Sequence, residues 1–170
     1  MLIENFNRTI DSWIKALEHY NFTQLCTKPS ANSWSLGQVY IHLIEDTKYY
    51  IEQIKICITT NDHVNEEASI NARKMLLDND FPDAILEGNP ANAYVPQPAS
   101  KEQLVSSLAG IKNEMNNLYR MALKSPFNGK TKHPGLNYFS AGEWLQFADM
   151  HFRHHLRQKR RIDHFLKMIN

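Results

Sequence analysis

Apolar residues recur at intervals of mostly three and four along four segments of this chain, at about 3–20, 35–59, 101–124 and 140–168. This spacing gathers the apolar side chains on one face of an α-helix, where they can pack against a partner. The pattern therefore predicts four amphipathic helices.

Capping signals mark where three of these helices begin. In each case a serine stands just before the periodic run and a Gln or Glu follows three residues later, which is the pattern of a capping box. The pairs are Ser35 with Gln38, Ser100 with Gln103, and Ser140 with Glu143.

The connections between the helices are long. About 40 residues separate the second and third helices; VNEEASINARKMLLDND there suggests a short extra helix, and EGNPANAYVPQPAS reads as an irregular, proline-bearing loop. The linker SPFNGKTKHPGLNYF precedes the last helix, and loops of this length are often functional. We expect an all-α fold, a four-helix bundle with a long crossover connection, formed by residues 1–170 as one domain.

Composition narrows the class of protein. The chain has 170 residues, of which 42% are hydrophobic and 22% charged, so it should be globular. The net charge of +1 argues against a protein dominated by non-specific phosphate binding. Two cysteines without CxxC spacing favour a reducing compartment. With no signal peptide and no apolar run of membrane-spanning length, we expect a soluble, cytoplasmic protein with no membrane partner.

Two histidines interrupt the apolar face of the last helix. The positions on this face are Trp144, Ala148, His151, His155, Gln158, Ile162, Phe165 and Ile169. His151 and His155 are four residues apart and therefore project together into the bundle. Buried imidazoles need partners, and a pair with this spacing can share a divalent metal. From spacing alone, a pair of buried histidines hydrogen-bonded to neighbouring helices is an equal alternative.

His42, on the second predicted helix, borders its apolar stripe and is a candidate third ligand. Taken alone, His42 is more typical of a histidine buried in the core than of a metal ligand. His154 lies at the edge of the last helix's stripe and is expected to be a flanking residue. His133, in the linker before that helix, could reach a pocket mouth.

These residues resemble a known family. Trp34-Ser35-Leu36-Gly37-Gln38 followed by His42, with His151-x3-His155-x2-Gln158 on the last helix, is similar to the DinB/YfiT-like metalloprotein superfamily. The resemblance covers essentially the whole chain. It implies a four-helix bundle with a crossover, one Zn or Ni ion held by His42, His151 and His155, and frequent homodimers. Characterised members include bacillithiol- or mycothiol-dependent transferases and isomerases, and many others are regarded as hydrolases.

Three neutral imidazoles would leave a dication with an open position for water or substrate, as in catalytic sites. The open position suits hydrolysis or activation of a low-molecular-weight thiol, and the sequence favours neither reaction over the other. Asp46, one turn beyond His42, is a candidate general base or hydrogen-bond acceptor for a ligand; a helix-polar residue without a role is the alternative. Gln158 is expected to orient a ligand, a water on the ion or a neighbouring helix.

Other candidate residues surround this predicted site. Trp34 and Trp144 are expected to pack the helix starts. Three tyrosines could line the open position: Tyr49, Tyr94 and Tyr138. Substrate specificity should lie in the loops at about 60–100 and 125–139.

The basic run RQKRR at 157–161 is expected to form a solvated face, with Arg153 and His164 also outward. An anion-binding or nucleic-acid surface is its alternative. The leading hypothesis is therefore a metal-dependent hydrolase or thiol transferase acting on a small molecule. The competitors are a non-catalytic bundle that binds metal or a partner, and a nucleic-acid-binding protein.

Overall fold

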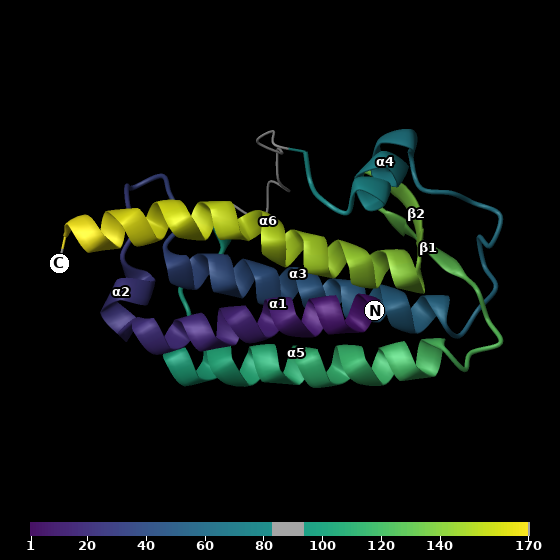
Figure 1. Cartoon of the computed structure of the whole chain (residues 1–170), viewed down its shortest axis with the longest axis horizontal. Coiled ribbons are helices and arrows are strands. Elements are labelled where there is room, and N and C mark those ends of the chain that lie inside the picture. Colours follow the sequence, from purple (N-terminus) through teal and green to yellow (C-terminus); the bar gives the residue numbers. More distant parts are fainter. Residues whose placement is uncertain (83–93, 170) are drawn as a thin grey trace.

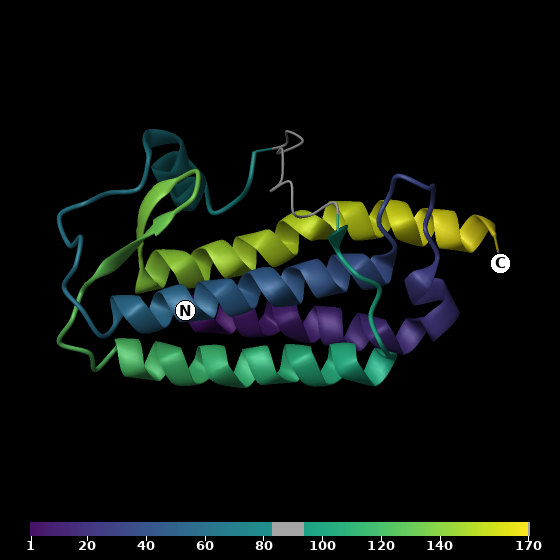
Figure 2. The same ribbon diagram turned by 180° about the vertical axis from the view of Figure 1, so that it is seen from behind.

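The computed structural model describes residues 1–82 and 94–169, and these residues fold around a bundle of long helices (Figures 1 and 2). The bundle consists of α1 (Leu2–Ala16), α3 (Leu36–Cys57), α5 (Lys101–Ala122) and α6 (Ala141–Met168). The shorter elements are η1 (Leu17–His19), α2 (Phe22–Cys26), α4 (Ile70–Asp78), β1 (Lys130–His133) and β2 (Asn137–Ser140). All four helices predicted from periodicity are present, and so is the short extra helix, α4.

The order of the helices around the bundle follows from their contacts. Helix α6 packs against α1 and α3, and α5 packs against the same two helices. In both views α1 and α6 run in one direction and α3 and α5 in the other (Figures 1 and 2). Because α3 and α5 are parallel, the chain between them must return along the bundle. The expected all-α bundle with a crossover connection is confirmed.

The capping boxes form as predicted at two of three helix starts. Ser35 and Ser140 each accept a hydrogen bond from the backbone three residues on, and the side chains of Gln38 and Glu143 accept one in return. At α5, Ser100 accepts from the Gln103 backbone, but the Gln103 side chain accepts from the backbone N–H of Ala99. One half of that box is therefore displaced by one residue.

The core lies between the inward faces of the four helices, and large aromatic side chains fill its centre. Trp13 meets Tyr40 edge to face at a ring distance of 5.0 Å, and the Tyr40 hydroxyl donates to the Trp13 carbonyl at 2.8 Å. On α6 the buried stripe continues to Leu166, whereas Ile169, predicted to face inward, is exposed. The stripe ends there because Ile169 lies beyond the last residue of the helix.

The long linker before the last helix contains a β-hairpin that was not predicted from the sequence. Strands β1 and β2 pair antiparallel, with His133 opposite Asn137 at the turn. Asn137 has a positive φ of 64°, a conformation that asparagine tolerates better than most residues. The Trp144 indole N–H donates to Thr131 Oγ1 at 2.7 Å and ties the hairpin to α6. Strands this short carry too little alternation to be recognised in a sequence.

Half of the expected loop EGNPANAYVPQPAS, residues 87–93, falls outside the described residues; its part from 95 to 100 contains no helix or strand. Within residues 1–82 and 94–169, no helix combines the length and apolar character that spanning a membrane requires.

Candidate metal centre

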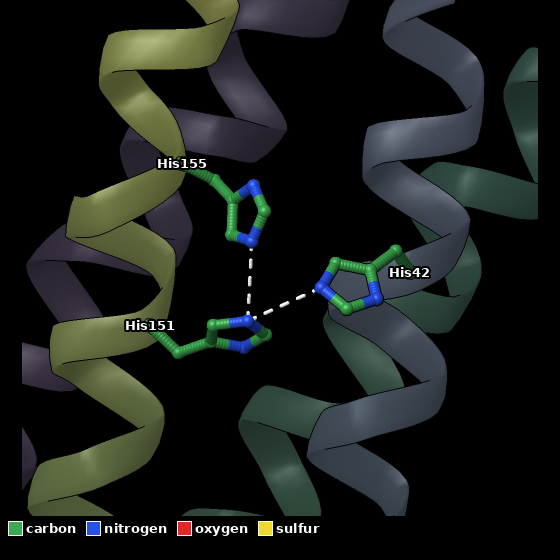
Figure 3. A group of neighbouring side chains, drawn as sticks. All are labelled: His42, His151 and His155. Atoms are coloured by element: carbon green, nitrogen blue, oxygen red, sulfur yellow. Dashed lines mark hydrogen bonds between the residues drawn. The ribbon is translucent and has the colours of Figure 1, made fainter. Parts of the chain in front are cut away.

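Three imidazole rings converge between α3 and α6 (Figure 3). His42 projects from α3, while His151 and His155 project from successive turns of α6. The Nε2 atom of His151 lies 3.2 Å from Nε2 of His42 and 3.1 Å from Nε2 of His155. One nitrogen from each ring falls within 4.8 Å of the other two. The structure thus brings together all three histidines proposed as ligands.

The outer nitrogens of the three rings each face a polar atom. His155 Nδ1 lies 2.8 Å from Gln158 Oε1, and His151 Nδ1 lies 3.5 Å from the Tyr50 hydroxyl. His42 Nδ1 lies 3.6 Å from Asp46 Oδ1. Acceptors on this side favour the tautomer with the proton on Nδ1. The Nε2 lone pairs then face one another across the centre of the cluster.

Converging lone pairs repel one another unless a cation lies between them. The Nε2 pairs His151–His42 and His151–His155, 3.2 and 3.1 Å apart, are close enough for one ion to contact both nitrogens of a pair at the usual metal–nitrogen distance of about 2.0–2.1 Å. The cluster therefore fits a divalent ion and could bind one. An ordinary pair of hydrogen-bonded core histidines would not direct a third ring to the same point.

Burial keeps these imidazoles in the form that binds metals. It lowers the pKa of His42 to about 4. Burial, with the neighbouring His42, lowers the pKa of His155 to about 3, and burial places the pKa of His151 well below its ordinary value. The three rings are consequently neutral at pH 7, so protons do not compete with a metal there.

Asp46 lies on α3, one turn beyond His42, and faces the cluster. Its Oδ2 atom is 3.8 Å from His151 Nε2, on the inner side, and 3.5 Å from the Tyr50 hydroxyl. Burial raises the pKa of Asp46 to about 6, although the Tyr50 hydrogen bond opposes the rise. The carboxyl is therefore close to the region where a reacting group would bind, and its pKa suits proton transfer near neutrality.

Tyr50 is a residue of the cluster's surroundings that was not among the candidates from the sequence. It is 5% exposed, and its hydroxyl lies between Asp46 Oδ2 and His151 Nδ1. A signal was present, since Tyr50 follows Asp46 by four residues and so shares its helix face. The partner on α6 could not be inferred from α3 alone.

A cavity of about 1260 Å³ opens beside the cluster, and the three histidines, Asp46 and Gln158 line it. Its walls also include Trp34, whose ring lies 5.0 Å from the ring of His42. Trp144, by contrast, is fully buried, as expected for a packing residue. Tyr49 lines the cavity. Tyr138 instead packs against His63 with the two rings tilted, and Tyr94 is 88% exposed outside the lining.

His133 and His154 also lie in the cavity wall. The hairpin stacks the His133 ring on Trp144, with ring centroids 5.4 Å apart, and the Gly135 N–H donates to the Nδ1 atom of His133 at 3.1 Å. Burial lowers the pKa of His133 to about 4. The neutral ring therefore carries its proton on Nε2 and is a hydrogen-bond donor. His154 packs against Phe81, which agrees with a flanking position.

The basic run does not form the uniformly solvated face expected. Lys159 is only 15% exposed and donates to Asp163 and to the Tyr20 hydroxyl. Arg153, also expected outward, binds the buried carboxylate of Asp149 at 3.0 Å. Arg160 and Arg161 are both exposed, as expected, and of the two Arg161 lines the cavity. Helical spacing indicates only the side of the helix from which each side chain projects, so it did not reveal which cations form ion pairs with acidic residues.

Comparison with curated proteins returned no match. A family model described as the DinB superfamily matches residues 5–158, a range that contains all three histidines and Gln158. The match covers most of the bundle, including α3 and the portion of α6 that carries the cluster. The chain belongs to the DinB superfamily.

Proposed function

We propose that this protein is a metal-dependent enzyme that binds one divalent ion, Zn or Ni, through His42, His151 and His155 and acts on a small molecule in the adjoining cavity. The observation that carries the proposal is the convergence of the three Nε2 atoms while each Nδ1 faces a polar atom outside. When bound, the ion would supply Lewis acidity, which lowers the pKa of a coordinated water or thiol.

Asp46 is the residue we propose as general base. Its Oδ2 atom lies on the cavity side of His151, and its raised pKa of about 6 makes it a stronger base than an ordinary carboxylate. In transfer of a thiol, the sulfur-bound proton passes to Asp46 and sulfur bonds to the electrophilic carbon. The bond from that carbon to the leaving group breaks, and the leaving group takes the electron pair.

The size of the cavity favours thiol transfer as the first reaction to test. Sites for one small molecule usually measure about 300–1000 Å³, and a volume of about 1260 Å³ leaves room for a thiol and an electrophile together. Hydrolysis is the second candidate, since Asp46 is equally placed to take a proton from water. Both reactions use the same base and the same open side of the cluster.

A non-catalytic metal-binding or partner-binding bundle is the alternative from another class. A structural ion would have a fourth protein ligand. Among the described residues, the group with mutually close ligand atoms contains His42, His151 and His155 but not Asp46. This arrangement supports an open position and therefore catalysis. X-ray absorption of the metal-loaded protein would count protein ligands; four of them would support the structural alternative.

Metal analysis of protein purified without an affinity tag tests the basis of the proposal. We expect about one Zn or Ni ion per chain in the wild type and a large loss in His151→Ala. His164→Ala, an exposed position on the same helix, is the matched control and should retain the metal. Negligible metal in wild type and His151→Ala alike would refute the site.

A substrate screen tests the reaction. Metal-loaded protein is incubated with bacillithiol and model electrophiles, and in parallel with simple esters and amides. Conjugation that requires the metal and is lost in Asp46→Asn would support thiol transfer; ester or amide cleavage with the same dependence would support hydrolysis. A metal-loaded protein inactive in both arms would favour the non-catalytic alternative.

Two other expectations stay predictions. Homodimer formation, implied by the family resemblance, is tested by light scattering of the purified protein. A cytoplasmic location is tested by cell fractionation.

A further inference from the structure

The cavity is lined at one end by one cation, Arg161, that has no acidic partner among residues 1–82 and 94–169. Arg161 makes no hydrogen bond or ion pair with the residues the structure describes, although it lines the cavity. The cations before it on α6 differ. Arg153 binds Asp149, Lys159 binds Asp163, and Arg157 approaches Asp80 at 3.8 Å. Among the described residues that line the cavity, Asp46 is the only one with a carboxylate. It lies beside the histidine cluster.

The amide of Gln158 adds a second donor at the same end. Its Oε1 atom accepts from His155 Nδ1–H at 2.8 Å, so the orientation of the amide is determined by the histidine. The two N–H bonds of Nε2 must then point away from His155, and Gln158 lines the cavity. Gln158 and Arg161 are three residues apart and therefore neighbours on the surface of α6. Both side chains therefore leave the same part of the surface of α6, and both line the cavity.

The loop between α2 and α3 borders this end of the cavity. It lies beside the C-terminal half of α6 in both views (Figures 1 and 2). Its residues Asn32 and Ser33 line the cavity together with Arg161. The loop contributes amide and hydroxyl groups but no carboxylate there. Among the described residues that line this end, an anion would consequently meet hydrogen-bond donors and no carboxylate.

The distance from the cluster to Arg161 suits a small ligand. The Cα atom of Arg161 is about 12 Å along the helix from the level midway between His151 and His155, at 1.5 Å per residue. Helical side chains lean toward the N-terminus, which brings the guanidinium back toward the cluster. One short molecule could therefore contact both.

We propose that Arg161 and Gln158 form a carboxylate-binding subsite, so that the substrate is a small metal-binding molecule, such as a thiol, that carries a carboxylate a few bonds away. The inference rests on the proposed function, because it requires an ion at the three histidines. Arginine is suited to this role, since its planar guanidinium binds a carboxylate with two parallel hydrogen bonds. Gln158 would hold a ligand imidazole and the substrate at once.

Binding to cobalt-substituted protein tests the subsite without an activity assay. Co²⁺-loaded wild type is titrated with mercaptoacetate, 3-mercaptopropionate and 4-mercaptobutyrate, and with the methyl ester of each. The thiolate-to-cobalt absorption band reports binding. We expect at least one acid to bind about ten- to a hundredfold more tightly than its ester, the usual gain from a hydrogen bond between charged groups.

Two variants assign the preference to Arg161. Arg161→Gln should bring acid and ester to equal affinity while keeping the cobalt spectrum. Arg160→Gln removes the adjacent charge outside the cavity and should retain the wild-type preference. A preference that is absent from the wild type, or equal in both variants, overturns the subsite but leaves the metal centre intact. Failure of the wild type to bind cobalt overturns the subsite and the proposed function together.

Discussion

The Nδ1 atom of His155 lies 2.8 Å from the Oε1 atom of Gln158, one turn further along α6. Because an amide oxygen only accepts hydrogen bonds, this contact places the His155 proton on Nδ1 and leaves Nε2 to face the cluster. Gln158 therefore prepares His155 to bind a metal. This corresponds to the first of the roles expected for Gln158 from the sequence.

Replacing Gln158 by Leu should weaken metal binding by about ten- to a hundredfold, the usual effect of losing a partner that orients a ligand. Gln158→Glu keeps an acceptor for Nδ1–H and should retain affinity near the wild-type value. Competition with a chromogenic chelator measures both. Equal affinity in Gln158→Leu and the wild type would show that the contact does not support the ligand.

Asp46→Asn should retain the metal and lower kcat/KM by about 10²–10⁴-fold, the usual contribution of a general base. In the wild type, kcat/KM should rise with pH through a value at or below about 6, because the base must be ionised and a bound dication lowers its pKa further. That limb of the profile should disappear in Asp46→Asn. An unchanged profile would assign the base elsewhere.

The metal-free protein should lose stability as the pH falls from about 6.5 toward 4. His42 and His133 have pKa values of about 4 when folded, below the ordinary 6.5, so the unfolded chain binds more protons in this interval. Each histidine contributes up to about 1.4 kcal/mol per pH unit. Asp46 contributes to the pH dependence with the opposite sign, because its pKa of about 6 in the folded protein lies above its ordinary value of 3.8. Its contribution offsets that of one histidine.

Urea midpoints at pH 7, 6 and 5 measure this dependence. His133→Phe should make it shallower, because one buried neutral imidazole is removed while its ring packing is largely kept. His164→Phe serves as the exposed control on α6. A metal-free protein that is equally stable at pH 7 and pH 5 would contradict the prediction.

The same substitution should have opposite effects at two glycines. A Cβ atom on Gly37 would lie 2.8 Å from Pro98 Cδ and 2.9 Å from the Leu25 carbonyl, whereas one on Gly110 would meet nothing within 4 Å. Gly37→Ala should lower the free energy of unfolding by about 1–3 kcal/mol through overpacking. Gly110→Ala, inside α5, should raise it by up to about 1 kcal/mol. Urea denaturation measures both, and effects of the same sign would contradict the packing around Gly37.

Asp149→Ala should lower the free energy of unfolding by about 3 kcal/mol, because it leaves a buried ion pair without its anion. Asp149 is 2% exposed; it accepts from Thr9 Oγ1 at 2.6 Å and pairs with Arg153. Asp11→Ala removes an exposed partner of Lys112 and should cost less than about 1 kcal/mol. Comparable losses in the two variants by urea denaturation would show that Asp149 does not act as a buried anchor.

Much of the fold was predictable because its signals are local. Periodicity located the four long helices, and the serines at positions 35, 100 and 140 marked three starts to the residue. The hairpin was missed because its stability comes from pairing between strands and from the contact of Thr131 with Trp144, neither of which appears in a helical or alternating pattern.

The sequence by itself determined that His151 and His155 share the inward face of one helix, since that depends only on the 3.6-residue period. It also placed Asp46 one turn from His42. The tertiary structure alone decided that His42 meets this pair, that Tyr50 lies between Asp46 and His151, and that Arg161 lines the cavity while Lys159 does not. The physical reason is that these relationships join α3, α6 and the connecting loops, and they exist only once the burial of the apolar faces has set how the helices pack.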